Sequence, residues 1–302
     1  MIYTVTFNPA IDYVLRLPAL REGETNRAAS AEIHFGGKGI NVSRVLAALG
    51  VESTALGFVA GFTGEALRSR LTEEGIATHL IPLPEGNTRI NVKLKTPDGQ
   101  ASETEINAPG PAIPADSVEA LYRKLDTLTE GDTLVLAGSI PPTLPRDTYR
   151  RILSCLAGRG IRFVVDAEGG LLTDTLPFAP FLIKPNRAEL EGIMGYALTT
   201  DTELRKAAAH LRELGARNIL ISLGGEGALL LDEDGGFHRK SAPAVTAVNT
   251  VGAGDSMVAG FLAGVRGGYE YALRLGIAAG SATASSEGLA TKEAVEALLA
   301  ML

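Results

Sequence analysis

The sequence contains few of the residues that many binding and catalytic sites require: one cysteine, Cys155, no tryptophan and four histidines. A single cysteine cannot form an intramolecular disulfide, which favours a reducing, cytoplasmic setting. The histidines are scattered and never show the H-E-x-x-H spacing, so we do not expect a zinc site. No run reaches the roughly 18 apolar residues of a membrane span, and the opening "MIYTVTFNPA" lacks the basic segment of a signal peptide.

Basic residues are outnumbered by acidic ones. The chain has 28 Lys and Arg against 35 Asp and Glu, a formal net charge of −7, which argues against a nucleic-acid or anionic-membrane partner. Length and apolar content are ample: 302 residues, of which 45% are hydrophobic. This is enough to bury the core of one large domain, residues 1–302.

Short apolar runs alternate with helical patterns along most of the chain. The runs "TLVLAGS", "RFVVDA", "PFLIKPN" and "NILISLG" are typical of buried strands. The segment "DTELRKAAAHLRELG" predicts a helix that ends at Gly215. Such alternation indicates an α/β fold, with a mostly parallel central sheet and helices on both faces.

Two polar segments interrupt this alternation. In "TRINVKLKTPDGQASETEIN", Ile90, Val92 and Leu94 alternate with polar residues, and residues 97–99 supply a turn signal. The earlier segment "DYVLRLPALREGETNRAAS" also looks extended. We expect residues 12–34 and 87–108, approximately, to form a small projecting sheet of antiparallel strands, here called the lid. Its apolar face needs a cover, either the substrate or another subunit.

Two helix starts are rich in glycine. In "TVGAGDSM", Gly252, Ala253, Gly254 and Asp255 precede an apolar helical pattern. Open amides at a helix start bind anions, and we expect them to keep Asp255 ionised, so that it can act as a base beside a phosphoryl group. A tight turn with an Asp cap explains the stretch equally well. In "FGGKGINVSRVLAALG", Lys38 lies beside similar amides, although a glycine-bounded helix start with a solvated lysine is again an alternative.

Three further stretches carry polar groups next to strands. In "IKPNRAELEG", Asn186 and Glu189 are spaced to face a hydrated magnesium ion or, more simply, to form a capping box. The glycines of "SLGGEGALL" suit a nucleotide cradle or a plain turn. In "FNPAIDYVL", Asp12 follows the first strand and is placed to hold sugar hydroxyls or to be a solvated loop acid.

Together these stretches resemble the ribokinase-like (PfkB) carbohydrate kinases over essentially the whole chain. "GGKGINVSRVLAALG" is similar to the N-terminal motif of that family and "NTVGAGDSMVAGFLAG" to its C-terminal one. The resemblance implies that Asp255 is the catalytic base, with an anion hole formed by Gly252, Ala253 and Gly254. It implies a sugar site at Asp12, Gly36, Gly37, Lys38 and Asn41, and MgATP contacts at Lys184, Asn186, Glu189, Asp166, Ser222, Gly224, Gly225 and Gly227. A monovalent cation is left open.

Within the family, "GETNRA", "TRINVK" and "TEINAPGP" look most like 1-phosphofructokinases. We therefore expect Arg27, Lys38 and Arg89 to converge on a sugar phosphate, with Ser139 as a further donor. The expected reaction is phosphorylation of fructose 1-phosphate by ATP, in a homodimer paired through the lid. Tagatose-6-phosphate kinase and 6-phosphofructokinase are alternatives, and a non-catalytic sugar-phosphate-binding regulator is the alternative from another class.

Overall fold

The computed structural model describes residues 1–96 and 103–302. In these residues the strands form a nine-stranded sheet, ordered β13-β12-β11-β10-β9-β8-β1-β4-β5, and a four-stranded sheet, ordered β3-β2-β6-β7. The large sheet is parallel from β11 to β5, whereas β12 pairs antiparallel with both β11 and β13. The predicted α/β fold is confirmed. The large sheet comprises β1 (Ile2–Thr6), β4 (Ser53–Ala60), β5 (Ala77–Leu83), β8 (Thr133–Ala137), β9 (Arg162–Asp166), β10 (Leu182–Ile183), β11 (Asn218–Ser222), β12 (Ala228–Leu231) and β13 (Phe237–Lys240).

The four apolar runs that predicted buried strands correspond to β8, β9, β10 and β11. They are apolar throughout because helices cover both faces of the sheet. In β8, Leu134 and Leu136 face one core cluster, while Val135 and Ala137 face the other.

Helices lie in two layers. One layer contains α3 (Ala115–Leu125), α4 (Thr148–Leu156), α5 (Gly169–Thr173), α6 (Arg187–Met194) and α7 (Asp201–Glu213). The other contains α1 (Lys38–Ala48), α2 (Gly61–Glu73), α8 (Ala253–Gly264), α9 (Tyr269–Ala284) and α10 (Lys292–Leu299). As predicted, α7 ends next to Gly215, whose φ of +126° suits glycine. Within the described ranges, no helix is long and apolar enough to span a bilayer.

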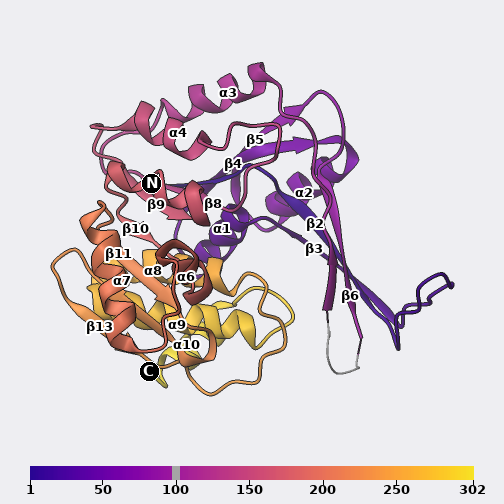
Figure 1. Cartoon of the computed structure of the whole chain (residues 1–302). Coiled ribbons are helices and arrows are strands. Elements are labelled where there is room, and N and C mark those ends of the chain that lie inside the picture. The colour runs from indigo at the N-terminus through magenta and orange to yellow at the C-terminus, as the bar shows by residue number, and fades with distance from the viewer. Residues whose placement is uncertain (97–102) are drawn as a thin grey trace.

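The small sheet is the lid, and it projects to one side of the body (Figure 1). It consists of β2 (Ala10–Arg16), β3 (Ser30–Gly36), β6 (Arg89–Lys95) and β7 (Glu103–Ile106). The antiparallel expectation is confirmed for β2 with β3 and for β6 with β7. It is wrong for β2 with β6, which pair in parallel because both strands leave the body at the same edge. The turn expected at residues 97–99 lies outside the described residues.

The two faces of the lid have opposite character and opposite exposure. On β6, Asn91 and Lys93 are each only 6% exposed and face the body, whereas Ile90 is 41% exposed. Tyr13 and Ile33, paired across β2 and β3, are also exposed on the lid. The apolar face is thus turned away from the body, so a substrate bound between lid and body does not cover it.

Candidate active site

A cleft opens where the lid meets the carboxyl-terminal ends of the parallel strands, where ligands bind in open α/β sheets. Its cavity measures about 380 Å³. Its walls come from the lid, from the starts of α1 and α8, and from the ends of β9 and β11. The cleft brings together most of the residues that the sequence singles out: Asp12, Gly37, Lys38, Asn41, Arg89, Asp166, Lys184, Asn186, Glu189, Ser222, Gly252, Gly254 and Asp255.

The start of α8 supplies open amides and a buried carboxyl. Gly252 is the N-cap residue, and its φ of +81° is a conformation that glycine adopts without strain. The amide of Ala253 donates to the carbonyl of Thr250 at 3.2 Å, so this member of the expected anion hole is already engaged. Gly254 and Asp255 follow in the first turn, where helix geometry leaves the amides without an intrahelical acceptor. An anion site here therefore rests on Gly254 and Asp255 more than on Ala253.

The carboxyl group of Asp255 is 4% exposed. Its Oδ2 accepts a hydrogen bond of 2.8 Å from Nδ2 of Asn41 on α1. Burial, and then the charge of Asp166, raise the pKa of Asp255 to about 6, while Asn41, Lys38 and Lys184 oppose the rise. Asp255 is therefore still ionised at pH 7, as expected, although burial brings its pKa closer to neutral than the ordinary value of 3.8. A carboxyl group with this pKa is ionised above pH 6 and can still accept a proton, as a general base requires.

Two lysines face Asp166 across the floor of the cleft. The Nζ atoms of Lys38 and Lys184 lie 3.5 and 3.4 Å from the same oxygen, Oδ1 of Asp166. Burial alone would lower the pKa of Lys38, but Asp166, Asp255 and Glu189 raise it above its usual value. Lys38 is therefore positioned as a permanent cation beside the start of α8, and Lys184 lies against the same carboxyl group. The other oxygen of Asp166, Oδ2, is buried and has no partner among the described residues.

Asn186 and Glu189 form the capping box of α6. Oδ1 of Asn186 accepts from the amide of Glu189 at 2.8 Å, and Oε2 of Glu189 accepts from the amide of Asn186 at 2.9 Å. The simpler of the two sequence interpretations thus holds, and both side chains also line the cleft. In the described residues, no group of three or more His, Cys, Asp or Glu could enclose a metal ion. A magnesium ion here would keep water and nucleotide ligands, as this ion usually does.

The three glycines after β11 lie in different surroundings. Gly224 and Gly225 have no neighbour within 4 Å of an added Cβ, so their backbone is open to a ligand. Gly227 has a φ of +93°, and an added Cβ would lie 2.1 Å from the carbonyl oxygen of Lys240. Gly227 is therefore required by the close approach of β13, whatever binds at the loop.

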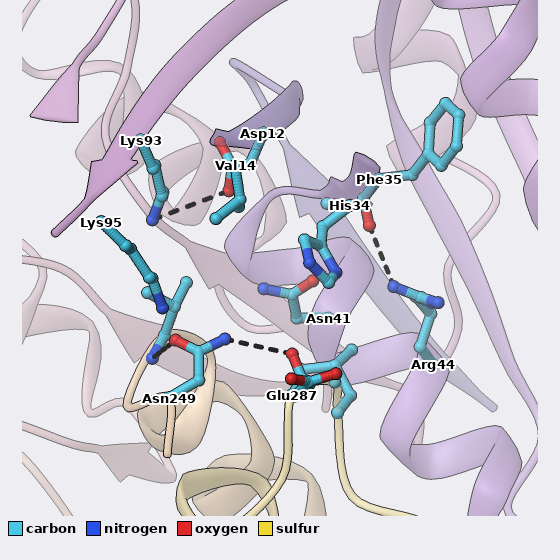
Figure 2. Close-up of a pocket in the computed structure, with 14 residues that line it drawn as sticks. Asp12, Val14, His34, Phe35, Asn41, Arg44, Lys93, Lys95, Asn249 and Glu287 are labelled. Carbon is cyan, nitrogen blue, oxygen red and sulfur yellow. Dashed lines mark hydrogen bonds and ion pairs between the residues drawn. The ribbon is translucent and has the colours of Figure 1, made fainter. Parts of the chain in front are cut away.

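The start of α1 is packed tightly against β1. A Cβ at Gly37 would lie 2.5 Å from Cγ2 of Thr6, and the hydroxyl of Thr6 accepts from the amide of Ile40 at 2.9 Å. Gly36 does not line the cleft. It lines an adjoining hollow that shares Asp12 and Asn41 with the cleft (Figure 2).

The lid contributes Asp12, Arg89 and Asn91 to the wall of the cleft. Oδ1 of Asp12 accepts a hydrogen bond of 2.8 Å from Asn91. Arg89 is partly buried, and it donates to the carbonyls of Asn8 at 3.2 Å and Ala108 at 3.4 Å. Sequence reasoning missed Asn91 and Lys93. The signal was present, since both lie on the polar face of the predicted strand, but the sequence does not tell which face meets the body.

Two predicted phosphate contacts lie apart from the cleft. Arg27 is exposed in the loop at residues 17–29, beyond the end of the lid farthest from the cleft (Figure 1). Arg89 pairs with Ala10 at the near end of the lid, and Arg16 at the far end is six residues, roughly 20 Å, away. The expected convergence of Arg27 with Lys38 and Arg89 therefore does not occur within one chain. Ser139 is exposed just beyond β8 and is not part of the cleft wall.

Comparison with known proteins identifies the family. The pfkB family of carbohydrate kinases matches residues 4–295. The chain belongs to this family. It is 46% identical to the 1-phosphofructokinase of Bacillus subtilis (99% of this chain, 97% of the relative) and 35% identical to the D-tagatose-1-phosphate kinase of Bacillus licheniformis (96% and 94%). The structure of Escherichia coli phosphofructokinase-2 in complex with substrates and products superposes with a TM-score of 0.93, at 31% identity, over 100% of this chain and 99% of that one.

Membership of the pfkB family gives the cleft a chemical meaning. A carbohydrate kinase must hold a sugar hydroxyl near a base and a phosphoryl group near cations and open amides. The family member described here has a buried carboxyl, two lysines and a glycine-rich helix start in one cavity, with polar lid residues opposite. Most of the residues that the motifs single out thus lie in one cavity, whereas Arg27, Ser139 and Gly36 do not line it.

Proposed function

We propose that this kinase transfers the γ-phosphoryl group of ATP to a ketohexose phosphate, and that its substrate is fructose 1-phosphate. The observation that carries the proposal is the meeting, in one cleft, of the buried carboxyl of Asp255 with the polar lid residues Asp12 and Arg89. The identity of 46% with a 1-phosphofructokinase over nearly the whole chain supports the choice of sugar. Residues 1–302 then act as one kinase domain that carries the lid as an appendage.

In the proposed reaction, Asp255 accepts the proton of the free primary hydroxyl of the sugar. The sugar oxygen forms a bond to the γ-phosphorus as the bond from that phosphorus to the bridging oxygen breaks, and ADP leaves. The hydrogen bond from Asn41 holds one carboxyl oxygen of Asp255, leaving the other for the substrate. The amides of Gly254 and Asp255, with Lys38, face the charge that develops on the transferring group.

The nucleotide side of the cleft is assigned to Lys184, Ser222, Gly224 and Gly225, which lie at or just beyond the ends of β10 and β11. The unpartnered Oδ2 of Asp166, with Asn186 and Glu189 nearby in the cleft, suits a hydrated magnesium ion. When bound, this ion offsets the charge of the phosphates. Activity measured in potassium and in tetramethylammonium buffers tests the monovalent cation that the sequence left open.

The apolar outer face of the lid supports a homodimer. Tyr13, Ile33, Ile90 and Ile106 are all at least one-third exposed there, and a soluble monomer rarely leaves such a sheet face uncovered. Pairing two lids would cover both faces. In such a pair, the loop that carries Arg27, which lies far from its own cleft, would reach the cleft of the second copy. There Arg27 would contact the sugar phosphate beside Arg89 of that copy. The use of ATP and a sugar phosphate is consistent with the cytoplasmic setting expected from composition.

The test is ADP release by the wild-type enzyme with fructose 1-phosphate, fructose 6-phosphate, tagatose 1-phosphate and tagatose 6-phosphate. The two ends of a fructofuranose ring each carry a CH₂ group, so the phosphates differ mainly in which end is occupied. We expect kcat/KM to be highest for fructose 1-phosphate. If kcat/KM is higher for another sugar phosphate, that compound is the substrate instead. Tight binding of a sugar phosphate without ADP release favours a non-catalytic regulator.

A further inference from the structure

Lys93 is a buried cation on the inner face of the lid. It is 6% exposed and extends from β6 toward Asp12 in the hollow that adjoins the cleft (Figure 2). Its Nζ lies 3.1 Å from Oε1 of Glu105 on β7 and 3.9 Å from Oδ2 of Asp12 on β2. Burying an ammonium group is costly unless the charge is compensated, so its position between two carboxylates requires a reason.

One oxygen of Asp12 is held by Asn91, and Asn91 is in turn held by the backbone. Nδ2 of Asn91 donates to Oδ1 of Asp12 at 2.8 Å. Oδ1 of Asn91 accepts a hydrogen bond of 3.3 Å from the backbone amide of Ala108. The backbone donor fixes which end of the Asn91 amide faces Asp12. Oδ1 of Asp12 is thus engaged within the lid, and Oδ2 is the oxygen left for a ligand.

The Nζ atom of Lys93 lies closer to Glu105 than to Asp12. At 3.1 Å the ammonium donates a hydrogen bond to Glu105, whereas at 3.9 Å it acts on Asp12 through charge alone. Glu105 thereby keeps Lys93 from occupying a lone pair of Oδ2. Asp12 gains a nearby positive charge and still has an oxygen free to accept hydroxyl hydrogen bonds.

We propose that Lys93 is a positioning residue for sugar recognition, which places a positive charge beside Asp12 and leaves Oδ2 of Asp12 available to the sugar. The inference rests on the proposed function, because it assumes that Asp12 binds the sugar. It adds the cation behind Asp12, and the tether from Glu105 that sets its distance.

A purely structural role makes different predictions. Lys93 and Glu105 are direct register partners on β6 and β7, so their ion pair could simply hold the two strands together. In that case, loss of either partner has similar effects on stability and on kinetics. If Lys93 acts on Asp12, loss of Lys93 affects sugar affinity, whereas Glu105→Gln retains the acceptor oxygen and leaves sugar affinity nearly unchanged.

The experiment measures KM for both substrates, kcat and the melting temperature of the purified enzyme. Lys93→Met should raise KM for the sugar phosphate roughly tenfold, the effect expected of a lost charged contact, and leave KM for ATP within about twofold. In Glu105→Gln, KM for the sugar phosphate and KM for ATP should each stay within about threefold of the wild-type values. Lys95→Met removes the same charge from the same strand, one pleat farther from Asp12, and should change the sugar KM much less.

A double-mutant cycle with Asp12→Asn isolates the coupling. If Lys93 works through Asp12, the variant Asp12→Asn/Lys93→Met has the same sugar KM as Asp12→Asn alone. Additive effects overturn the inference. So does full recovery of sugar KM in Lys93→Met/Glu105→Gln, since Lys93 would then serve only to neutralise Glu105.

Two provisions keep the test decisive. If Lys93→Met does not fold, Lys93→Gln/Glu105→Gln keeps a hydrogen-bonded pair without charges and should show the same rise in sugar KM. Wild-type sugar KM in that folded variant overturns the inference. A wild-type enzyme that neither binds nor phosphorylates any of the four sugar phosphates overturns the proposed function and this inference together, whereas normal wild-type activity confines any failure to Lys93.

Discussion

Replacing Asp255 by Asn should make the protein more stable and far less active. The ordinary pKa of an Asp side chain is 3.8, and burial with the charge of Asp166 raises that of Asp255 to about 6. Each unit of pKa corresponds to about 1.4 kcal/mol, so keeping Asp255 ionised in the folded protein costs up to about 3 kcal/mol at pH 7. The cost is shared with Asp166 through their mutual repulsion, so we expect a gain of about 1–3 kcal/mol in the free energy of unfolding.

The gain should depend on pH in a defined direction. Because the pKa is higher in the folded state than in the unfolded state, folding takes up a proton between these values. Below about pH 3.8 both states are protonated and the cost is absent. It grows between pH 3.8 and about 6 and is complete above pH 6. The advantage of Asp255→Asn should therefore be largest at pH 7 and should shrink toward pH 4.

Thermal unfolding and steady-state kinetics provide the assay. At pH 7 the melting temperature of Asp255→Asn should exceed that of wild type by roughly 2–5 °C. Turnover should fall by roughly 10²–10⁴ while both substrates still bind, and wild-type kcat/KM should decline below pH 6 as Asp255 is protonated. Asp174→Asn, at an exposed position, is the control and should change neither quantity. A less stable Asp255→Asn at pH 7 refutes the electrostatic argument, and activity within a few-fold of wild type removes Asp255 from the mechanism.

Three further variants test the proposed site. Arg89→Ala should raise KM for the sugar phosphate roughly tenfold to a hundredfold, and equal rises for sugar and ATP would indicate that its bonds to Asn8 and Ala108 are its main role. Val92→Lys on the outer face of the lid should weaken dimerisation in sedimentation and raise the sugar KM together; a fully active wild-type monomer contradicts this. Gly254→Ala places a Cβ 3.1 Å from Nζ of Lys184, and should raise KM for ATP with little change in melting temperature.

The sequence predicts most of the body of the molecule because local patterns determine it. Continuous apolar runs occur where helices cover both faces, and they correspond to β8 through β11. Gly37 at the start of α1 and Gly252 and Gly254 at the start of α8 line the cleft. At Gly37 the backbone lies too close to Thr6 of β1 to carry a side chain. These features depend on neighbours in the sequence or on one face of one element.

The features that the sequence does not predict all depend on long-range contacts. Alternation in "TRINVKLK" gives two faces, but only the packing of the lid shows that Asn91 and Lys93 face inward. The glycine-rich helix start suggests that Asp255 is ionised, but the rise of its pKa depends on its depth of burial and on the charge of Asp166. Motif reasoning placed Arg27 beside Lys38 and Arg89 because it does not show that residues 17–29 form a loop at the far end of the lid.

The lid is built from separate segments of the chain, each of which enters it from the body at the cleft. Asp12 and Arg89, which are assigned to the sugar, lie on these segments, whereas Lys38, Asp166 and Asp255 lie on α1, β9 and α8. An exchange of lids between two members of the family would therefore transfer substrate preference and subunit pairing in a single step. Asp255, Lys38 and Lys184 would remain with the recipient. In directed recombination, crossovers placed at residues 9, 37, 88 and 108 are thus expected to yield chimaeras that change sugar while keeping the chemistry.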